Sequence, residues 1–334
     1  MSELSTTVLG AGSWGSAMAM LIARSGCPVK LWCRNPDAAE ALQAKRSDER
    51  YLPGMSLPPS IEVGSDLAAA VDGAELLVSA VPSSGTREVA RALREQDLRG
   101  VSWLSTSKGL EGDRLLRMSQ VIDEVLPALG GYAVLSGPSF AKEVAEEQPT
   151  AVVVASEDLD LARRLQEQLS GPRFRAYASD DVVGVELGGA VKNVIAIAAG
   201  LLAGRGFGHD PLAALITRGL HELSALATAL GGRPETMAGL AGLGDLVLTC
   251  TGPLSRNRRL GEAIGQGAST EQALAALGQV AEGATTARKV VELAESVGVE
   301  MPISTAVVRV LEGAKAPGDA LHDLMTRSLK DERA

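Results

Sequence analysis

The first half of the chain alternates short apolar runs with longer stretches in which apolar residues recur at helical spacing. Stretches such as 14–26, which ends at Gly26, predict amphipathic helices. Around them lie eight runs rich in strand-forming residues, at 6–10, 29–34, 61–65, 74–82, 101–109, 132–139, 151–156 and 173–179. Strands that alternate with helices imply βαβ crossovers, so we expect a mostly parallel sheet with helices on both faces.

The strand pattern ends near Asp181, and the rest of the chain has the spacing of helices alone. Helices are predicted at 182–203, 211–230, 234–241, after Arg256, and at 270–277, 283–297, 303–313 and 317–328. A chain of 334 residues also exceeds what one hydrophobic core usually serves. We therefore predict an α/β domain at 1–180 and an all-helical domain at 181–334.

One of the predicted helices is strongly apolar but carries two polar side chains near its middle. Residues 186–200 are apolar or glycine almost throughout, yet Lys192 and Asn193 stand side by side among them. Burying an ammonium and an amide there is costly unless both are paired or hydrated. Together with Glu186, they make the segment a poor membrane span. We expect a buried core helix whose lysine has a chemical task.

Composition places the chain among ordinary globular proteins and narrows its partners. With 46% hydrophobic residues, 22% charged residues and a net charge of −9, it lacks the basic surface that nucleic acid requires. Cys27, Cys33 and Cys250 are scattered and odd in number, which suits reduced cytoplasmic thiols better than a disulfide framework. No signal peptide is recognisable, and the three histidines lack metal-ligand spacing. We expect a cytoplasmic protein without a metal, a nucleic-acid partner or a membrane span.

The run G-A-G-S-W-G lies between the first predicted strand and the first predicted helix. Gly10 permits a tight turn, Gly12 lets the backbone approach a pyrophosphate, and Gly15 permits close packing of the helix on the strand. The helix N-terminus then presents free N–H groups to the anion. The fold class is therefore an α/β Rossmann-type dinucleotide-binding domain followed by an all-α C-terminal domain.

The end of the second strand indicates which nicotinamide cofactor binds. An acidic residue there hydrogen-bonds the ribose of NAD, whereas an arginine accommodates the 2′-phosphate of NADP. The chain has Cys33, Arg34 and Asn35 at this point and no carboxylate before Asp37. We predict NADP(H), or NADP(H) and NAD(H) alike, with a solvated surface arginine as the alternative for Arg34.

Several cationic and turn residues suit an anionic small substrate. Lys108 follows the fifth strand, at the edge where open α/β sheets bind ligands, and the turn 137–139 follows the sixth. Asp245 follows a glycine-rich segment, and Ser255 caps a helix whose first turn, 256–259, is basic. Cations are disfavoured at a helix N-terminus, so an Arg256 fork beside the free amides there suggests a bound phosphate.

Eight motifs in this order resemble the bacterial NAD(P)-dependent glycerol-3-phosphate dehydrogenases over essentially the whole chain. They are GAGSWG, STSKGL, SGPSFAKEV, ELGGAVKNVIAIAAG, ALITRGLHEL, GLGDLVLTC, SRNRRLG and VAEGATTA. The segment GFGHD before the fifth motif departs from the family's pattern, and it leaves the role of His209 and Asp210 open. The resemblance also implies a homodimer.

The resemblance implies a reversible, NAD(P)H-dependent reduction of dihydroxyacetone phosphate to sn-glycerol 3-phosphate, which supplies the glycerol backbone of phospholipids. Lys192 matches the family's catalytic lysine, which would stabilise and protonate the oxygen that forms as the carbonyl takes up hydride. Burial and a second ammonium at Lys108 would lower its pKa, whereas Asp245 would oppose that shift and orient it. Asn193 could hydrogen-bond the substrate hydroxyl.

The remaining matches follow the family's pattern position by position. The catalytic companions of Lys192 are Lys108, Asn193, Asp245 and Thr249. The substrate positions are Lys108, Gly137, Ser139, Lys192, Asp245, Ser255, Arg256 and Asn257. Besides the three glycines of the loop, the cofactor positions are Ser13, Trp14, Arg34, Lys108, Ala141, Arg256, Val280 and Glu282.

Two other functions fit parts of the sequence. A 3-hydroxyacid or 6-phosphogluconate type of dehydrogenase also joins a dinucleotide domain to a helical one, but it uses Lys-x-x-Asn, whereas Lys192 and Asn193 are adjacent. A non-catalytic NAD(P)-binding sensor needs the glycine loop but not the set Lys108, Lys192, Asp245 and Arg256.

Cofactor preference tests the interpretation of Arg34. The enzyme should accept NADPH at least as well as NADH, and Arg34→Glu should weaken NADPH binding more than NADH binding. The two dissociation constants of parent and variant measure this. Equal effects on both cofactors would show that Arg34 does not contact the 2′-phosphate.

Overall fold

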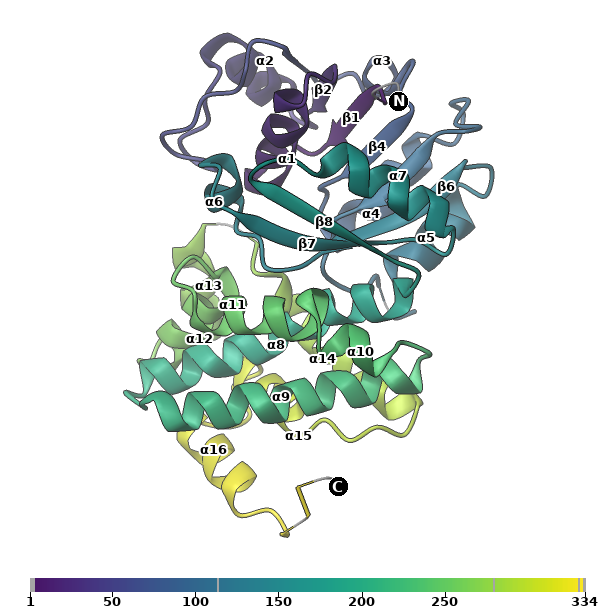
Figure 1. The fold of residues 1–334 in the computed structure, drawn as a ribbon. Helices are drawn as coiled ribbons and strands as arrows, with labels where there is room; N and C mark the ends of the chain where they lie inside the picture. Colours follow the sequence, from purple (N-terminus) through teal and green to yellow (C-terminus); the bar gives the residue numbers. More distant parts are fainter. Residues whose placement is uncertain (1–3, 113, 279, 330, 333–334) are drawn as a thin grey trace.

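The computed structural model describes residues 4–112, 114–278, 280–329 and 331–332, with a sheet in its upper part and helices below (Figure 1). The described strands form a single sheet in the order β3-β2-β1-β4-β5-β6-β7-β8. Their bounds are β1 (Thr6–Leu9), β2 (Val29–Trp32), β3 (Ile61–Gly64), β4 (Leu76–Ser79), β5 (Ser102–Ser105), β6 (Gly131–Ser136), β7 (Thr150–Ala155) and β8 (Phe174–Ser179). Each overlaps a predicted run, and the α/β prediction is confirmed.

One pair of neighbouring strands departs from the parallel arrangement. β6 and β7 run antiparallel, whereas the other neighbours in the sheet are parallel. The segment that joins them contains only the short helix α6 (Ala141–Ala145), and it turns back without crossing the sheet. The turn 137–139 and α6 therefore stay at the edge where β6 ends.

Helices cover both faces of the sheet, as the alternation predicts. Consecutive residues of a strand point to opposite faces, and in β1 Val8 packs in a cluster with Met18 and Leu161, while Leu9 packs in another with Val89. These partners lie on helices from opposite sides. The helices of this part are α1 (Ser13–Arg24), α2 (Pro36–Lys45), α3 (Leu67–Val71), α4 (Ser83–Ala92), α5 (Met118–Val125), α6 and α7 (Leu159–Leu169).

After β8 the described chain forms helices, as predicted. They are α8 (Val182–Gly204), α9 (His209–Ala229), α10 (Pro234–Met237), η1 (Leu240–Gly244), α11 (Asp245–Thr251), α12 (Arg256–Gly265), α13 (Thr270–Leu277), α14 (Glu282–Ser296), α15 (Pro302–Leu311) and α16 (Pro317–Met325). The expected helix 234–241 is shorter. α10 ends at Met237, and a π-helical turn, η1, leads into α11. A Cβ on Gly242 would lie 2.1 Å from the Met237 carbonyl oxygen, so this tight turn depends on glycine.

Helix α8 runs through the centre of the helical half. By length and hydropathy it is apolar enough to cross a membrane, but 94% of its most apolar window is buried inside the protein. It packs against α9, α11, α12 and α14 (Figure 1). The arrangement is that of a core helix, as the sequence predicts.

Glycines let the backbones of α8 and α12 touch. A Cβ on Gly200 would lie 1.9 Å from the Arg258 carbonyl oxygen, and one on Gly261 would lie 2.0 Å from that of Ile197. Gly204 and Gly265 make the same kind of approach one turn further along. No side chain fits between the helices at these points.

Replacing Gly200 by alanine tests this packing, because two effects oppose each other. Alanine favours a helix interior by about 1 kcal/mol over glycine. Overpacking against a backbone carbonyl costs about 3 kcal/mol. We expect Gly200→Ala to lower the free energy of unfolding by about 2 kcal/mol, as measured by urea denaturation.

Gly208→Ala is the matched control. Gly208 has an ordinary φ of −86°, and a Cβ there would meet no atom within 4 Å. Because Gly208 is the N-cap of α9 and alanine is a poorer cap than glycine, this variant should lose less than about 1 kcal/mol of its free energy of unfolding. If Gly200→Ala is as stable as this control, α8 and α12 do not pack as described.

Candidate active site

The turn between β1 and α1 has the geometry that its glycines predict. Gly10 has a φ of +106°, in the region that favours glycine, and its N–H donates to the Trp32 carbonyl at 2.9 Å. A Cβ on Gly15 would lie 1.7 Å from the Gly10 carbonyl oxygen. Helix α1 therefore rests directly on the turn.

Gly12 leaves the N-terminus of α1 open to a ligand. It caps α1 in an extended conformation, no side chain caps the helix there, and a Cβ on Gly12 would meet no atom within 4 Å. The first-turn N–H groups and the helix dipole thus suit a pyrophosphate. Ser13 donates its hydroxyl to the Tyr51 carbonyl at 2.5 Å. The residues present fit a nicotinamide dinucleotide.

The strand order brings the polar residues to the same edge as this turn. β1 lies between β2 and β4, which makes the carboxyl end of β1 the point where the winding of the sheet reverses. Lys108 follows β5 and Gly137 follows β6, both at the carboxyl edge. Gly137 has a φ of +140°, and its carbonyl accepts hydrogen bonds from Lys108 Nζ at 3.2 Å and Ser139 Oγ at 3.0 Å.

Asp245 holds two ammonium groups at the centre of the site. Its Oδ2 accepts from Lys108 Nζ at 2.7 Å, and its Oδ1 accepts from Lys192 Nζ. Lys192 Nζ also donates to Thr249 Oγ1 at 2.9 Å, and that hydroxyl donates to the Asp245 carbonyl at 2.6 Å. Asp245 is 1% exposed and Lys192 is 5% exposed, so little water reaches the group. The four side chains form one connected network.

Burial and charge set the protonation behaviour of this network. Burial lowers the pKa of Lys192 to about 7; the Asp245 carboxylate opposes this shift and the Lys108 ammonium adds to it. Burial alone would raise the pKa of Asp245, but the two ammonium groups outweigh it and hold that pKa below its ordinary value. Lys192 is therefore the member of the network that can exchange a proton near neutral pH.

Asn193 ties α8 to the loop that carries Lys108. Its Nδ2 donates to the Lys108 carbonyl at 3.1 Å and to the Gly189 carbonyl at 3.3 Å. These bonds hold the backbone of Lys108 beside the helix that carries Lys192. A hydrogen bond from Asn193 to the substrate stays a prediction.

Helix α12 begins with a basic first turn. Ser255 caps it by accepting from the Arg258 N–H at 3.2 Å, and Arg256 is exposed at its first position. Asn257 is buried, and its Oδ1 accepts from the Gly283 N–H at 3.0 Å. The adjacent Glu282 accepts from the Ser83 N–H at 3.2 Å, which links the start of α14 to the sheet domain.

The other predicted cofactor residues lie on separate elements around the carboxyl edge. Arg34 is 76% exposed just after β2, with its Nη1 3.8 Å from Glu88 Oε2, so it is on the surface. Trp14 packs against the core in the first turn of α1, and Ala141 begins α6. Val280 is 53% exposed just before α14. Their contacts with a cofactor stay predictions.

The sequence patterns assigned no role to a second buried polar group. Glu186, treated above only as a charge that disfavours a membrane span, accepts hydrogen bonds from Arg117, Ser119 and Tyr132. A carboxylate in an apolar helix is a signal for buried partners, but nothing in the sequence pattern indicates which residues they are.

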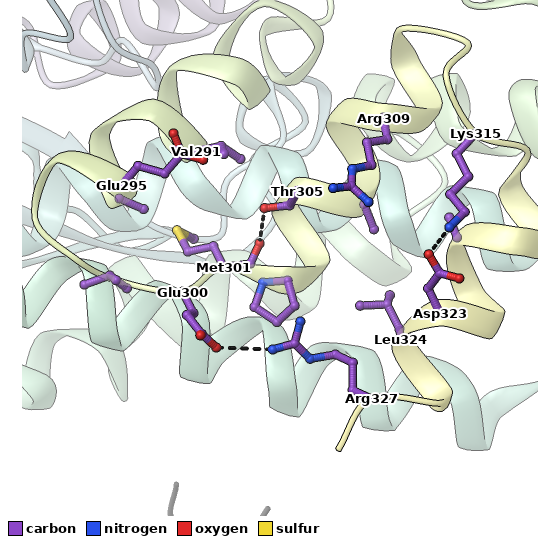
Figure 2. Close-up of a pocket in the computed structure, with 15 residues that line it drawn as sticks. Val291, Glu295, Glu300, Met301, Thr305, Arg309, Lys315, Asp323, Leu324 and Arg327 are labelled. Atoms are coloured by element: carbon purple, nitrogen blue, oxygen red, sulfur yellow. Dashed lines mark hydrogen bonds and ion pairs between the residues drawn. The ribbon is translucent and has the colours of Figure 1, made fainter. Parts of the chain in front are cut away.

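The described residues contain no group of three or more His, Cys, Asp or Glu side chains that could hold a metal ion. A cavity of about 390 Å³ lies among α14, α15 and α16 (Figure 2). Four of its charged side chains form two ion pairs, Lys315 with Asp323 and Arg327 with Glu300. It includes neither Lys108 nor Lys192, so the reactive group lies elsewhere.

The chain matches two family models over most of its length. They are the NAD-dependent glycerol-3-phosphate dehydrogenase N-terminus, over residues 5–162, and C-terminus, over residues 181–322. The glycerol-3-phosphate dehydrogenase (NAD(P)+) of Chlorobium phaeobacteroides (strain BS1) is 48% identical, with 98% of each chain covered. That of Nitratidesulfovibrio vulgaris (strain Hildenborough) is also 48% identical, with 97% of this chain and 99% of the relative covered.

A solved structure agrees with these matches. The crystal structure of glycerol-3-phosphate dehydrogenase from Coxiella burnetii superposes with a TM-score of 0.93 at 41% identity, covering 97% of this chain and 99% of the other. Two family models, near-complete relatives and the shared fold agree with the motif order in the sequence. The chain belongs to the family of NAD-dependent glycerol-3-phosphate dehydrogenases.

Proposed function

We propose that this protein catalyses the reversible, NAD(P)H-dependent reduction of dihydroxyacetone phosphate to sn-glycerol 3-phosphate, which supplies the glycerol backbone for phospholipid synthesis. The observation that carries the proposal is the lysine pair on Asp245, with Lys192 buried and Lys108 partly buried, in a chain that also has a dinucleotide loop and a basic helix N-terminus. It joins a proton donor, a cofactor site and an anion site in one place.

Lys192 is the proton donor in the direction of reduction. As the substrate carbonyl takes up hydride, negative charge builds on its oxygen, and a nearby ammonium stabilises and then protonates it. Burial keeps the pKa of Lys192 near neutral, so the proton leaves readily. Lys108 adds positive charge on the substrate side. Asp245 and Thr249 orient the Lys192 ammonium, and Asn193 holds the Lys108 loop against α8.

Arg256 holds the substrate phosphate. The guanidinium fork and the free N–H groups at the start of α12 suit a dianionic phosphate, and Ser255 fixes that helix end. Asn257 joins α12 to α14 at Gly283 and so sets the position of Arg256. Gly137 and Ser139 lie next to the substrate on the side of the sheet domain. The Gly137 carbonyl accepts hydrogen bonds from the Lys108 ammonium and the Ser139 hydroxyl.

The nicotinamide dinucleotide supplies the hydride when it is bound. The turn with Gly10, Gly12 and Gly15 holds its pyrophosphate at the start of α1. Arg34 is exposed just after β2, where its guanidinium would pair with a 2′-phosphate in place of its exposed contact with Glu88. The further contacts come from residues of both halves: Ser13, Trp14, Lys108, Ala141, Arg256, Val280 and Glu282.

The domain division and assembly belong to the same proposal. A dinucleotide-binding domain at 1–180 and a catalytic helical domain at 181–334 fit the end of β8 at Ser179 and the start of α8 at Val182. The scattered free thiols, Cys27, Cys33 and Cys250, support a cytoplasmic location. We expect a homodimer from the family.

Removing the Lys192 ammonium tests its role as proton donor. Lys192→Ala should lower kcat for dihydroxyacetone phosphate by about 100-fold or more, with the NADPH dissociation constant within about twofold of the parent value. In the parent, kcat for reduction should fall as pH rises above about 7, because the neutral amine has no proton to donate. Near-normal turnover by a folded Lys192→Ala enzyme contradicts the role.

Arg256→Ala tests the phosphate site. It should raise KM for dihydroxyacetone phosphate by about 100-fold and also lower kcat, because the phosphate contact helps to hold the carbonyl in place. Arg256→Lys should already be impaired, since an ammonium cannot make the bidentate contact.

Dihydroxyacetone, which lacks the phosphate, is the control substrate. It should react poorly with the parent enzyme and lose much less activity on Arg256→Ala. Equal losses with both substrates would place Arg256 in cofactor binding or in the fold. Hydroxyacid substrates in the same assay would show turnover if the enzyme were of the 3-hydroxyacid or 6-phosphogluconate type.

A further inference from the structure

Glu186, in the first turns of α8, is a buried carboxylate outside the reactive network. It is 7% exposed, and its two oxygens accept four hydrogen bonds. The donors are Arg117 Nη1 at 2.7 Å, the Ser119 N–H at 2.7 Å, Ser119 Oγ at 2.8 Å and Tyr132 Oη at 2.7 Å. An ionised carboxylate is stable in such a place only with partners of this kind.

All of these partners belong to the other half of the molecule. Arg117 and Ser119 form the start of α5, and Tyr132 lies in β6, whereas Glu186 belongs to the helical half. Burial and the Glu186 carboxylate hold the pKa of Tyr132 well above its ordinary value, so its hydroxyl remains a donor. The hydrogen bonds of Glu186 therefore connect α8 to the sheet domain in a defined orientation.

Glu186 shares one face of α8 with two residues that meet the Lys108 loop. Positions 189 and 193 lie three and seven residues after position 186, so the three positions share one side of a helix. A Cβ on Gly189 would lie 3.2 Å from Lys108 Cγ, and Asn193 donates to the Lys108 carbonyl. This face sets how α8 is turned toward the sheet.

The orientation of that face decides where Lys192 points. Lys192 lies six residues after Glu186, about 9 Å further along the same helix. Side-chain atoms lie about 5–6 Å from a helix axis, so a rotation of α8 by about 15° moves such an atom by about 1.4 Å. A misplacement of about 1 Å at a reacting group can cost about 100-fold in rate.

We propose that Glu186 is a positioning residue for the reaction. Its bonds to Arg117, Ser119 and Tyr132 set the rotation and depth of α8 against the sheet domain, and thereby the placement of Lys192 against Lys108 and Asp245. This inference rests on the proposed function. It assigns Glu186 no contact with substrate or cofactor.

A second buried glutamate provides a matched control for a purely structural role. Glu222, on α9, is 3% exposed and accepts from the Ile303 N–H, the Ser304 N–H and Ser304 Oγ at the start of α15. Like Glu186, it bonds a serine at a helix N-terminus through both backbone and hydroxyl. Its partners, however, belong to the same helical half.

The experiment compares Glu186→Gln with Glu222→Gln in the full chain. For each variant, urea denaturation measures stability, fluorescence quenching measures NADPH binding, and steady-state kinetics with dihydroxyacetone phosphate measure kcat, KM and the pH profile of kcat. The parent enzyme in the same assay tests the proposed function itself. If the parent does not reduce dihydroxyacetone phosphate, the proposed function is wrong.

Glu186→Gln should lower kcat by about 10- to 100-fold, with the NADPH dissociation constant within about twofold of the parent value. The pH at which kcat falls should move upward. Weaker contacts between α8 and the sheet domain would admit water to Lys192, and burial is the main cause of the low pKa of Lys192. Glu222→Gln should keep kcat and this pH within about twofold and 0.3 pH unit of the parent. Loss of stability without these kinetic changes would not support the inference.

Two results would overturn the positioning role while the parent remains active. One is a Glu186→Gln enzyme with parental kcat and pH profile, and the other is an equal loss in both glutamate variants. If Glu186→Gln does not fold, Tyr132→Phe removes one of the four hydrogen bonds and keeps the charge. It should lower kcat by about threefold or more and shift the pH profile in the same direction, and unchanged kinetics in this variant would also overturn the role.

Discussion

The Asp245 carboxylate, shared between the ammonium groups of Lys108 and Lys192, is the interaction on which the rest of the structure depends. The ammonium groups of the buried Lys192 and the partly buried Lys108 repel each other and lose hydration, so an anion between them stabilises the pair. Asp245 provides one oxygen to each lysine. Lys108 belongs to the sheet domain, whereas Lys192 and Asp245 belong to the helical half. The reactive centre is therefore also a junction between the two halves.

That junction requires backbones to approach closely, and glycines permit it. A Cβ on Gly188 would lie 2.5 Å from the Ala241 carbonyl oxygen, so α8 rests on the π-helical turn that precedes Asp245. Gly189 faces Lys108, and Gly200 faces α12, which carries Arg256. Helix α8 thus has close backbone contacts with η1 and α12, and at Gly189 it lies against the side chains of Lys108 and Ser136. A helix held in this way keeps Lys192 in place without the movement that a long side chain allows at a surface.

The charge of the site is opposite to that of the whole protein. The chain has a net charge of −9, yet Lys108, Lys192 and Arg256 gather around the region proposed for a phosphorylated substrate. Asp245 lies between two of these cations, and the partly buried Glu282 interacts with all three. Because the carboxyl edge and the start of α12 bring the cations together locally, attraction of an anion does not need a basic protein. A net charge far from zero favours solubility, whereas the proposed local cations suit an anionic ligand.

The sequence by itself determined the kinds of element and indicated the candidate reactive positions. Strand runs alternating with helical periods predicted the α/β half, and the glycine spacing from Gly10 to Gly15 predicted the turn that the structure has, because both depend on residues close together in the chain. Lys192 was identified as a candidate functional residue because burying an ammonium in an apolar helix is costly unless it is paired.

Only the tertiary structure decided which residues those positions meet. The Lys108–Asp245 pair and the four donors around Glu186 join segments far apart in the chain, and the antiparallel pairing of β6 with β7 and the end of α10 at Met237 follow from packing that the periodicity did not indicate. Local periodicity carries no information on contacts across such separations, because they follow from how whole helices and strands pack. The sequence marks a buried carboxylate or ammonium as costly, and only the packed fold supplies its partners.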